Sequence, residues 1–288
     1  MLALRGALER RGVAVRVNSM SADVHICNSA WFDIAAFDSA ISRGGARMIH
    51  RVDGPIALYR GTDWAEDEKI WNLNRRFAGA TVFQSAWCMT RMAEHGLTFR
   101  RPMIIGNAVD PVLFHSPASH SETSGRRLRL ISSAWSDNPR KGGSLYRYLD
   151  EALDWSRYEY TFVGRVQQEF KNIRHVQALP SSDLADLMRQ HDIYITASQA
   201  DPCSNALLEA LACGLPALYL DDGGHGSLVG FGGLPFQGQP DVLGQLDRLA
   251  AHYAQFRALI HVDGIDAIAG RYLAVARNLA AESNPQPG

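Results

Sequence analysis

The feature that most constrains this chain is the apolar segment Ser204 to Pro216, which reads SNALLEALACGLP. Every residue in its middle is apolar apart from Glu209, a pattern typical of a helix that is buried on several sides. Ser204 or Asn205 can cap the start of this helix, and Gly214 suits the left-handed position at its end. The segment therefore predicts a core helix that carries one carboxylate.

That carboxylate needs an explanation, because a buried charge is costly unless it has a partner or faces a polar cleft. Asn205 and Glu209 are four residues apart, so they share one helix face, with Glu209 roughly 6 Å further along the axis. Free N–H groups at a helix start attract an anion. A phosphate at the start and a hydroxyl group near Glu209 would fit a nucleotide. A plain core helix whose Glu209 reaches solvent fits this segment equally well.

Short apolar strands and helices alternate along the chain, which predicts an α/β fold with mainly parallel sheets. In the first half, the expected helices are 1–11, 32–43, 67–77 and 86–95, and the expected strands are 13–17, 22–27, 48–52, 80–84 and 102–105. In the second half, the expected strands are 128–132, 160–163, 193–197 and 217–220 with a short one at 176, and the further helices are one ending near 153, 182–190, 243–253 and 265–279.

A polar stretch at 117–127 interrupts this alternation and is the expected linker between two domains. The first domain is then 1–116 and the second is 128–281, with the last helix free to pack back on the first domain. Residues 282–288 read as a disordered polar tail. Two such domains would place their ligands at the carboxyl ends of the strands.

The charge balance excludes several classes of partner. The 288 residues include 29 basic and 30 acidic side chains, so no global field attracts nucleic acid or an anionic membrane. No apolar run approaches the roughly 20 residues of a membrane span, and the first residues do not form a signal peptide. We expect a cytoplasmic protein without a transmembrane segment and without nucleic acid, for which peripheral membrane contact stays open.

The four cysteines are Cys27, Cys88, Cys203 and Cys213, and they form neither a C-x-x-C pair nor a disulfide framework. A reduced compartment is the simplest interpretation of this usage. Because the cysteines have no partners at ligand spacing, we expect no metal site.

Asp201 precedes the central helix, with seven residues between it and Glu209, and the helix leads through the turn ACGLP into a strand and the loop Asp221 to Gly224. This order resembles the signature of retaining GT-B glycosyltransferases of the family 4 type, the glycosyl transferases group 1. The usual first acid of that family is Glu, and here it is Asp201. The resemblance implies two Rossmann-like domains that face one another across a cleft.

It also implies a function. Such an enzyme moves a sugar from a nucleoside diphosphate sugar, here a UDP- or GDP-sugar, to a hydroxyl of a glycan or lipid-linked acceptor. The anomeric configuration is retained, and no metal or other cofactor is obligatory. Two other interpretations stay open: a nucleotide-sugar 2-epimerase, and a non-catalytic GT-B protein that binds nucleotide or supports a partner enzyme.

The resemblance assigns roles to residues of the second domain. Glu209 would hold the ribose and Asp201 would face the transferred sugar as a catalytic residue. The further donor-binding candidates are Ser204, Asn205, Gly223 and Gly224. Family members often carry Pro-Glu after the Gly-Gly pair, whereas this chain has Gly226 and Ser227.

Lys141, followed by Gly142, matches the lysine-glycine pair that the family uses near the donor diphosphate. A cation beside glycines at a strand-to-helix turn can bind a diphosphate, so Lys141 is both a donor-binding and a catalytic candidate. The family's arginine in this loop is absent, and we expect Arg140 to supply its charge.

In the first domain, the segment from His50 to Pro55 forms the end of the expected strand 48–52 and the residues after it. His50 matches the family histidine that contacts the donor sugar, and a histidine there can bind a hydroxyl or carry a proton. Arg51, Asp53 and Arg60 are weaker candidates for contacts with the acceptor. Aromatic residues such as Trp31, Trp64 and Trp71 could line an acceptor groove, and packing inside the domain explains them as well.

The chain starts with a helix, whereas the resembled enzymes begin with a strand and a glycine-rich loop. We therefore expect a first domain that lacks its first strand, and a sheet with unpaired backbone groups at one edge. Nucleotide binding would survive this loss because its residues lie in the second domain.

Overall fold

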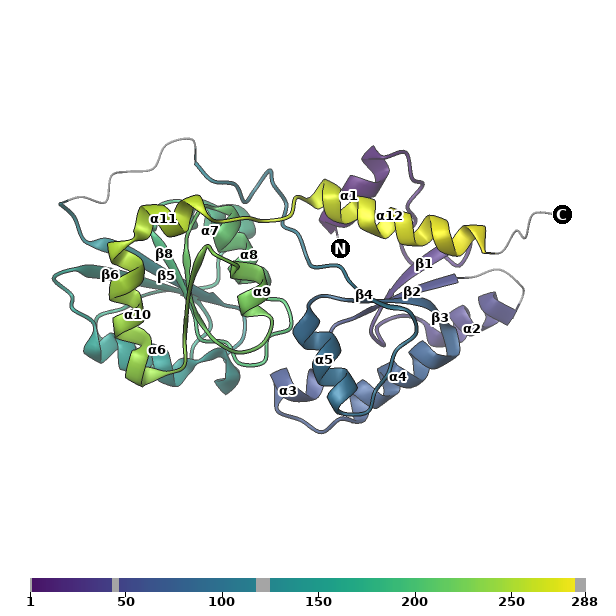
Figure 1. Cartoon of the computed structure of the whole chain (residues 1–288), viewed down its shortest axis with the longest axis horizontal. Coiled ribbons are helices and arrows are strands. Elements are labelled where there is room, and N and C mark those ends of the chain that lie inside the picture. Colours follow the sequence, from purple (N-terminus) through teal and green to yellow (C-terminus); the bar gives the residue numbers. More distant parts are fainter. Residues whose placement is uncertain (1, 43–46, 118–124, 283–288) are drawn as a thin grey trace. The chain divides into compact units, whose positions relative to one another are not determined.

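The computed structural model describes residues 2–42, 47–117 and 125–282, which form two compact units (Figure 1). Unit 1 combines residues 1–108 with 263–288, and unit 2 consists of residues 109–262. Both units are parallel sheets covered by helices, so the predicted α/β fold with two domains is correct.

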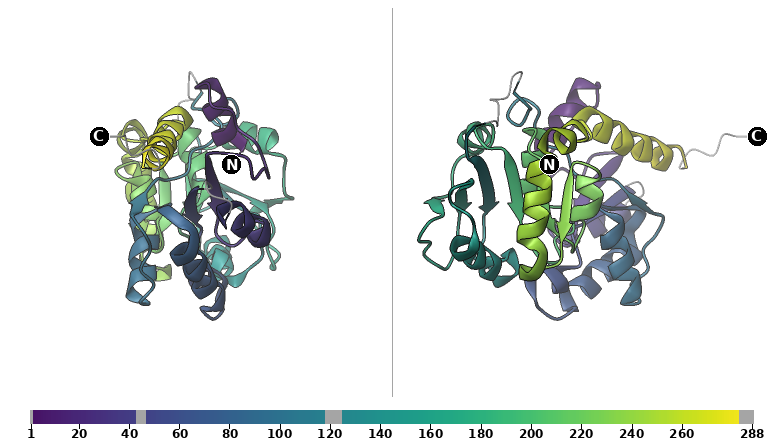
Figure 2. Two further views of the ribbon diagram at one scale, coloured as in Figure 1. Left: turned by 90° about the vertical axis from the view of Figure 1, so that its right-hand side faces the viewer. Right: turned by 60° about the vertical axis from the view of Figure 1, so that its left-hand side comes forward.

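Unit 1 contains a four-stranded parallel sheet in the order β1-β2-β3-β4. Its strands are β1 (Val24–Asn28), β2 (Arg47–Val52), β3 (Ala78–Phe83) and β4 (Pro102–Ile104). Its helices are α1 (Leu2–Arg10), α2 (Ile34–Ser42), α3 (Ile56–Arg60), α4 (Ala65–Phe77), α5 (Ala86–Glu94) and α12 (Ile265–Ala281). Helices α1 and α12 lie side by side on one face of the sheet, and helices α2, α4 and α5 cover the other (Figures 1 and 2).

The unit boundaries differ from the expected domain boundaries at the segment from Val109, whereas the last helix packs on unit 1, as the sequence analysis allowed. Helix α12 belongs to unit 1, where Ile268 and Tyr272 pack with Leu4 and Leu8 of α1. The segment from Val109 belongs to unit 2, because Phe114 is buried in that unit's core. Most of the expected linker and most of the expected tail lie outside the described residues.

The predicted strand at 13–17 is wrong, because these residues are irregular. Among the described residues of the sheet, β1 pairs only with β2, so residues 13–17 have no strand beside them to complete a ladder. Val13 and Val15 instead pack against the core beneath α1 and α12. Their apolar character therefore reflects packing and not strand pairing.

Unit 2 contains a six-stranded parallel sheet in the order β10-β9-β8-β5-β6-β7. Its strands are β5 (Leu128–Ala134), β6 (Tyr158–Gly164), β7 (Arg174–Val176), β8 (Ile193–Thr196), β9 (Ala217–Leu220) and β10 (Gly233–Phe236). Its helices are the 3-10 turn η1 (Pro139–Lys141), α6 (Gly143–Ala152), α7 (Ser181–Met188), α8 (Asn205–Ala212), α9 (His225–Val229), α10 (Gln239–Ala251) and α11 (Tyr253–Ala258). Helices α6 and α10 cover one face, and α7, α8 and α9 cover the other.

The strand order of unit 2 reverses direction at β5. The chain runs outward from β5 through β6 to β7, and then returns to β8 on the other side of β5. In a parallel α/β sheet such a reversal opens a crevice between the two adjacent carboxyl ends, and ligands bind there. The carboxyl ends of β5 and β8 are therefore the expected place for a site within this unit.

Several short elements were not expected from the sequence. Helix α3 is one of them, and its first two N–H groups, from Ile56 and Ala57, donate to the carboxylate of Asp67 at 2.8 Å each. Because Asp67 lies on the next helix, this cap is a tertiary contact that no local pattern in residues 56–60 reveals. The predicted helix 243–253 begins four residues earlier, and α11 follows as a separate turn.

Candidate functional site

Three loops of unit 2 meet at the carboxyl ends of β5, β8 and β9. The Gln199 N–H donates to the carbonyl of Arg140 at 2.7 Å, which joins the loop after β8 to the loop after β5. The Gly224 N–H donates to the carbonyl of Asp201 at 2.8 Å, which joins the loop after β8 to the loop after β9. These bonds hold the side chains of the three loops in fixed relative positions.

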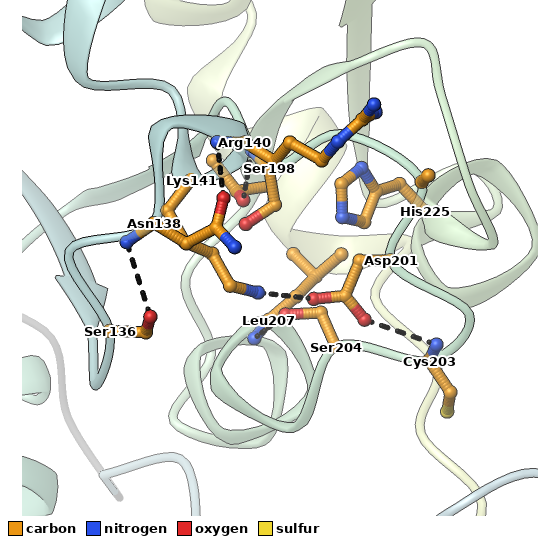
Figure 3. Close-up of polar contacts among 12 residues, drawn as sticks. Ser136, Asn138, Arg140, Lys141, Ser198, Asp201, Cys203, Ser204, Leu207 and His225 are labelled. Atoms are coloured by element: carbon orange, nitrogen blue, oxygen red, sulfur yellow. Dashed lines mark hydrogen bonds and ion pairs between the residues drawn. The ribbon is translucent and has the colours of Figure 1, made fainter. Parts of the chain in front are cut away.

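Lys141 and Asp201 form an ion pair at this place, with 3.0 Å between Nζ and Oδ2 (Figure 3). The other carboxylate oxygen of Asp201 accepts from the Cys203 N–H at 3.2 Å. The Lys141 side chain is 36% exposed and that of Asp201 is 13% exposed, so the lysine remains open to solvent on one side. Two residues that lie 60 positions apart, both expected at the site, are therefore in contact.

Two glycines make the close approach of these loops possible. Gly142 has φ +85°, and a Cβ at this position would lie 2.3 Å from the Cβ of Ala197. Gly223 has φ +67°, and its Cβ would lie 2.4 Å from the carbonyl oxygen of Asp201. Any side chain at either position would push the loops apart and would strain a left-handed backbone.

Helix α8 starts beside the ion pair, as the sequence predicts. Ser204 is its N-cap, and the serine hydroxyl accepts from the Leu207 N–H at 3.3 Å. Asn205 is exposed at the first helical position. The hydroxyl satisfies one of the N–H groups of the first turn, and the start of a helix is a place that favours an anion.

Glu209 lies one turn further along α8 and is partly buried. Among the described residues, its carboxylate has neither a hydrogen-bond donor nor a cation as partner. Burial raises the pKa of Glu209 to about 7. The lone charge that the sequence singles out is therefore an unpaired carboxyl group held in a poorly solvated place.

Arg140 contributes its backbone to the site. Its N–H donates to Oδ1 of Asn138 at 2.9 Å, and its carbonyl holds the loop after β8. Within the described parts of the chain, its guanidinium makes no ion pair, so the charge expected there is available.

His225 is a residue of this site to which the sequence analysis gave no role. Its side chain is fully buried, and Figure 3 draws it beside Asp201 and Lys141. Nδ1 lies 3.1 Å from the carbonyl of Leu220, so Nδ1 carries the proton and Nε2 has a free lone pair. No described residue hydrogen-bonds this Nε2, and burial lowers the pKa of His225. The sequence signal that could have identified His225 is its position directly after Gly223 and Gly224, in the loop after an expected strand.

In unit 1, the structure does not support a sugar contact by His50. This side chain is fully buried, Nε2 donates to the Ser29 carbonyl at 2.8 Å, and Nδ1 accepts from Asn74 at 3.1 Å. Both ring nitrogens are thus used inside the unit. Burial lowers the pKa of His50 to about 4, so the ring is neutral at pH 7. The sequence alone does not tell which side chains of β2 are solvated, and in the structure the His50 ring is buried inside unit 1.

The three weaker candidates of unit 1 separate into a pair and a single residue. Arg51 and Asp53 form an ion pair with side chains that are 12% and 20% exposed. Arg60 is exposed at the end of α3, where its guanidinium lies 5.6 Å from the ring centre of Tyr59. Among the described residues, no hydrogen bond or ion pair joins Arg60 to Arg51 or Asp53.

In the described residues, no group of three histidine, cysteine or acidic side chains has an arrangement that could hold a metal ion. The described helices include none that is both long enough and apolar enough to span a membrane.

Part of the sequence matches a known protein family. The family "Glycosyl transferases group 1" matches residues 159–234, which include β8, the Asp201 loop, α8 and the Gly223 loop. No curated protein matches the chain.

Solved structures resemble the chain over nearly its whole length. Sucrose-phosphate synthase from Thermosynechococcus elongatus has a TM-score of 0.68 at 15% identity, over 90% of this chain and 74% of that one. HepE from Anabaena, solved in complex with UDP-glucose, has a TM-score of 0.65 at 16% identity, over 98% and 82%. The chain has the GT-B fold. Trehalose 6-phosphate synthase from Burkholderia multivorans is similar too, with a TM-score of 0.64 at 12% identity over 99% and 77%.

Proposed function

We propose that this protein is a glycosyltransferase that moves a hexosyl group from a nucleoside diphosphate sugar to a hydroxyl acceptor. The observation that carries the proposal is the arrangement of Lys141, Asp201 and Glu209 around the start of α8, at the carboxyl ends of β5 and β8. The group 1 family match covers two of these three residues. Similarity to HepE, whose structure contains UDP-glucose, supports a UDP-sugar as the donor.

The donor would lie along α8. Its ribose hydroxyls would donate to the Glu209 carboxylate, which has no other hydrogen-bond partner among the described residues. Its diphosphate would lie at the start of the helix, near Ser204 and Asn205, and beside the loop that contains Gly223 and Gly224. Glu209 would thus recognise the nucleoside, while the start of α8 would recognise the negative charge of the diphosphate.

Lys141 would act on the leaving group. When the bond between the sugar and the diphosphate breaks, negative charge grows on the diphosphate, and an ammonium held nearby stabilises it. The unpaired guanidinium of Arg140 would add to this stabilisation. Asp201, freed from Lys141, would accept hydrogen bonds from hydroxyls of the transferred sugar.

The finer features of the proposal follow the family 4 type. Transfer would retain the anomeric configuration and would require no metal, because Lys141, Arg140 and the helix start supply the positive charge. The acceptor would be a glycan or a lipid-linked glycan in a cytoplasmic biosynthesis of polysaccharide. Residues of unit 1 would hold it.

The first test is a thermal-shift screen with UDP, GDP, ADP and their glucose, mannose and N-acetylglucosamine derivatives. A ligand at 100 times its dissociation constant adds about 2.7 kcal/mol of stability, which gives a clear shift. The donor that binds is then incubated with the protein and with glycan acceptors, and the nucleoside diphosphate released is measured. No shift with any nucleotide would refute the proposal.

The same assay separates the alternatives. A 2-epimerase converts the donor without an acceptor, and NMR of the donor sugar detects this conversion. A non-catalytic binding protein shows the thermal shift without release of diphosphate for any acceptor. That second outcome would agree with the Lys141–Asp201 ion pair, because a lysine that stays paired with Asp201 does not stabilise the leaving diphosphate.

A further inference from the structure

Unit 2 has a pocket at the amino ends of its strands, at the edge of the sheet opposite to the candidate site. Its volume is about 470 Å³, and its walls are the starts of β5, β6 and β7 and the end of α7 with the residues that follow. Pockets of this size hold small ligands. Strand β5 has seven residues, so roughly 20 Å separates this pocket from the loop of Lys141. A small ligand here would not touch the donor.

Three arginines line this pocket, Arg127, Arg129 and Arg174, and we call it the arginine pocket. Strand β6 lies between β5 and β7, with Glu159 opposite Arg129 and Thr161 opposite Arg174. Glu159 and Thr161 are two residues apart, and opposite residues of neighbouring strands point to the same face. Arg129 and Arg174 therefore approach the pocket from the two sides of β6.

Two acids lie beside the arginine pocket, and both are paired with other arginines. Glu159 lies 3.0 Å from Arg127. Asp192 accepts from Arg126 through both carboxylate oxygens, at 2.7 and 2.8 Å. Among the side chains that line the pocket, three arginines and one glutamate leave an excess of two positive charges.

Arg129 and Arg174 carry this excess. Within the described parts of the chain, neither of them forms an ion pair. Arg129 Nη1 donates to the carbonyl of Gln190 at 3.2 Å, which orients the guanidinium without neutralising it. A guanidinium presents planar donors that match a phosphate group, so two of them can bind one phosphate through several charged hydrogen bonds.

His191 shows that the two guanidinium groups converge. It is buried in the wall of the pocket, where Nδ1 donates to the Leu187 carbonyl at 2.7 Å and Nε2 accepts from the Thr161 hydroxyl at 3.0 Å. Burial lowers the pKa of His191, and the positive charges of Arg129 and Arg174 lower it further. Both guanidinium groups therefore lie close enough to act on one imidazole ring, which is neutral at pH 7.

Trp155 adds a donor that has no partner. The indole lines the pocket and packs against the core of unit 2. Its Nε1 is buried and has no hydrogen-bond acceptor among the described residues. A buried N–H without an acceptor is unfavourable, and an oxygen of a bound ligand would satisfy it.

We propose that the arginine pocket binds a small phosphate monoester, and that this ligand is distinct from the sugar donor. Arg129 and Arg174 would hold the phosphoryl group, whose two negative charges match the excess of two positive charges. The indole N–H of Trp155 would donate to an oxygen in the rest of the ligand. The inference does not rest on the proposed function, because none of these residues takes part in it.

The test is isothermal titration of the full chain with glycerol 3-phosphate, ribose 5-phosphate and glucose 6-phosphate, and with glycerol, ribose and glucose as the neutral counterparts. At least one ester should bind, and its neutral counterpart should bind at least about tenfold more weakly. Arg129→Gln and Arg174→Gln should each weaken binding of that ester at least about tenfold, since each removes a charged hydrogen bond. Trp155→Phe should weaken it about fivefold, since it removes a neutral one.

Glu159→Gln should have the opposite effect. It removes the carboxylate that competes with the ester for Arg127, so binding should become about two- to fivefold tighter. Arg248→Gln is the matched control, because Arg248 is an exposed arginine of the same unit that does not line the pocket. Thermal denaturation of each variant checks its fold, and Arg174→Gln at an exposed side chain keeps the test decisive if Arg129→Gln does not fold.

Lipids also carry phosphate monoesters, so vesicles of phosphatidylcholine with phosphatidic acid are a separate arm. Sedimentation with these vesicles, without binding of any soluble ester, would overturn the inference. Wild-type affinity in either arginine variant or in Trp155→Phe, or weaker binding in Glu159→Gln, would overturn it as well.

The two proposals can fail separately. UDP should bind with the same affinity in the presence and in the absence of the ester, and mutual competition would place the ester at the donor site and reject the arginine pocket. A protein that binds no nucleotide, yet binds an ester in a way that depends on Arg129 and Arg174, would reject only the glycosyltransferase.

Discussion

The Nζ atom of Lys141 lies 3.0 Å from the carboxylate of Asp201, and these residues come from loops after two neighbouring strands. The lysine that we propose as the ligand of the diphosphate is therefore paired before the donor binds. A dianionic diphosphate can compete for this ammonium, because the Lys141 side chain is still 36% exposed. Lys141 would leave Asp201 for the diphosphate when the donor binds. Substitution of Lys141 and substitution of Asp201 should therefore change UDP binding in different ways.

Lys141→Ala should weaken binding of the nucleoside diphosphate by about 10- to 100-fold, the value of a charged hydrogen bond of roughly 1.5–3 kcal/mol. Binding of the bare nucleoside should change little, because its contacts lie along α8. Isothermal titration with UDP and with uridine measures both. Lys171→Ala, at an exposed lysine of the same unit, is the control. Equal losses for UDP and uridine would argue against a role in phosphate binding.

Asp201→Asn should have the opposite profile. It removes the anion that competes with the diphosphate for Lys141, so UDP should bind as tightly as in the wild type or more tightly. Transfer should fall by about 10- to 100-fold, because the sugar loses a charged acceptor of its hydroxyls. Initial rates of UDP release at saturating donor measure the second effect. A variant with weak UDP binding and normal transfer would contradict the proposed roles.

Glu209→Gln tests the unpaired carboxyl group through pH. Burial raises the pKa of Glu209 from the ordinary 4.5 of a glutamate to about 7, so the folded protein holds this proton more tightly than the unfolded chain. The contribution to stability is therefore fully present below pH 4.5, falls as the pH rises toward 7, and stays low above it.

Glutamine cannot ionise, so the variant should be more stable than the wild type at pH 8, by roughly 1–3 kcal/mol. The two proteins should be about equal at pH 5. Urea denaturation at both pH values measures the difference, and the same gap at both would remove the titration of Glu209 as its cause. The variant should also bind UDP about tenfold more weakly, since it loses a charged acceptor for the ribose.

The sequence predicted those parts of the site that depend on short-range patterns. The period of α8, its Ser204 cap and its single carboxylate at Glu209 all follow from residues within one segment. The places of the loops follow as well, because the carboxyl ends of parallel strands share one edge.

The contacts between distant segments could not be predicted in this way. The Lys141–Asp201 pair depends on the strand order, which puts β8 beside β5, and no local pattern gives that order. The buried position of His225 depends on Leu220 and on the loops that cover it. Residues 13–17 have the composition of a strand, yet a strand exists only where a neighbouring backbone pairs with it.

His50 matches the family histidine in the sequence, yet its contacts in the structure are those of a residue that holds unit 1 together. Its buried ring donates a hydrogen bond to the Ser29 carbonyl and accepts one from the Asn74 amide. The same amide also donates to Thr81 at 2.8 Å. His50→Ala should therefore destabilise unit 1 by roughly 2–4 kcal/mol, because it leaves buried polar groups unpaired and opens a cavity.

Thermal denaturation of the variant measures this loss. His50→Gln is the informative companion, since a glutamine can replace one of the two hydrogen bonds and should recover part of the stability. At a temperature where the variants are folded, UDP binding and donor turnover should be close to the wild-type values. A stable His50→Ala protein with normal UDP binding and abolished transfer would restore the histidine to the reaction and overturn its structural role.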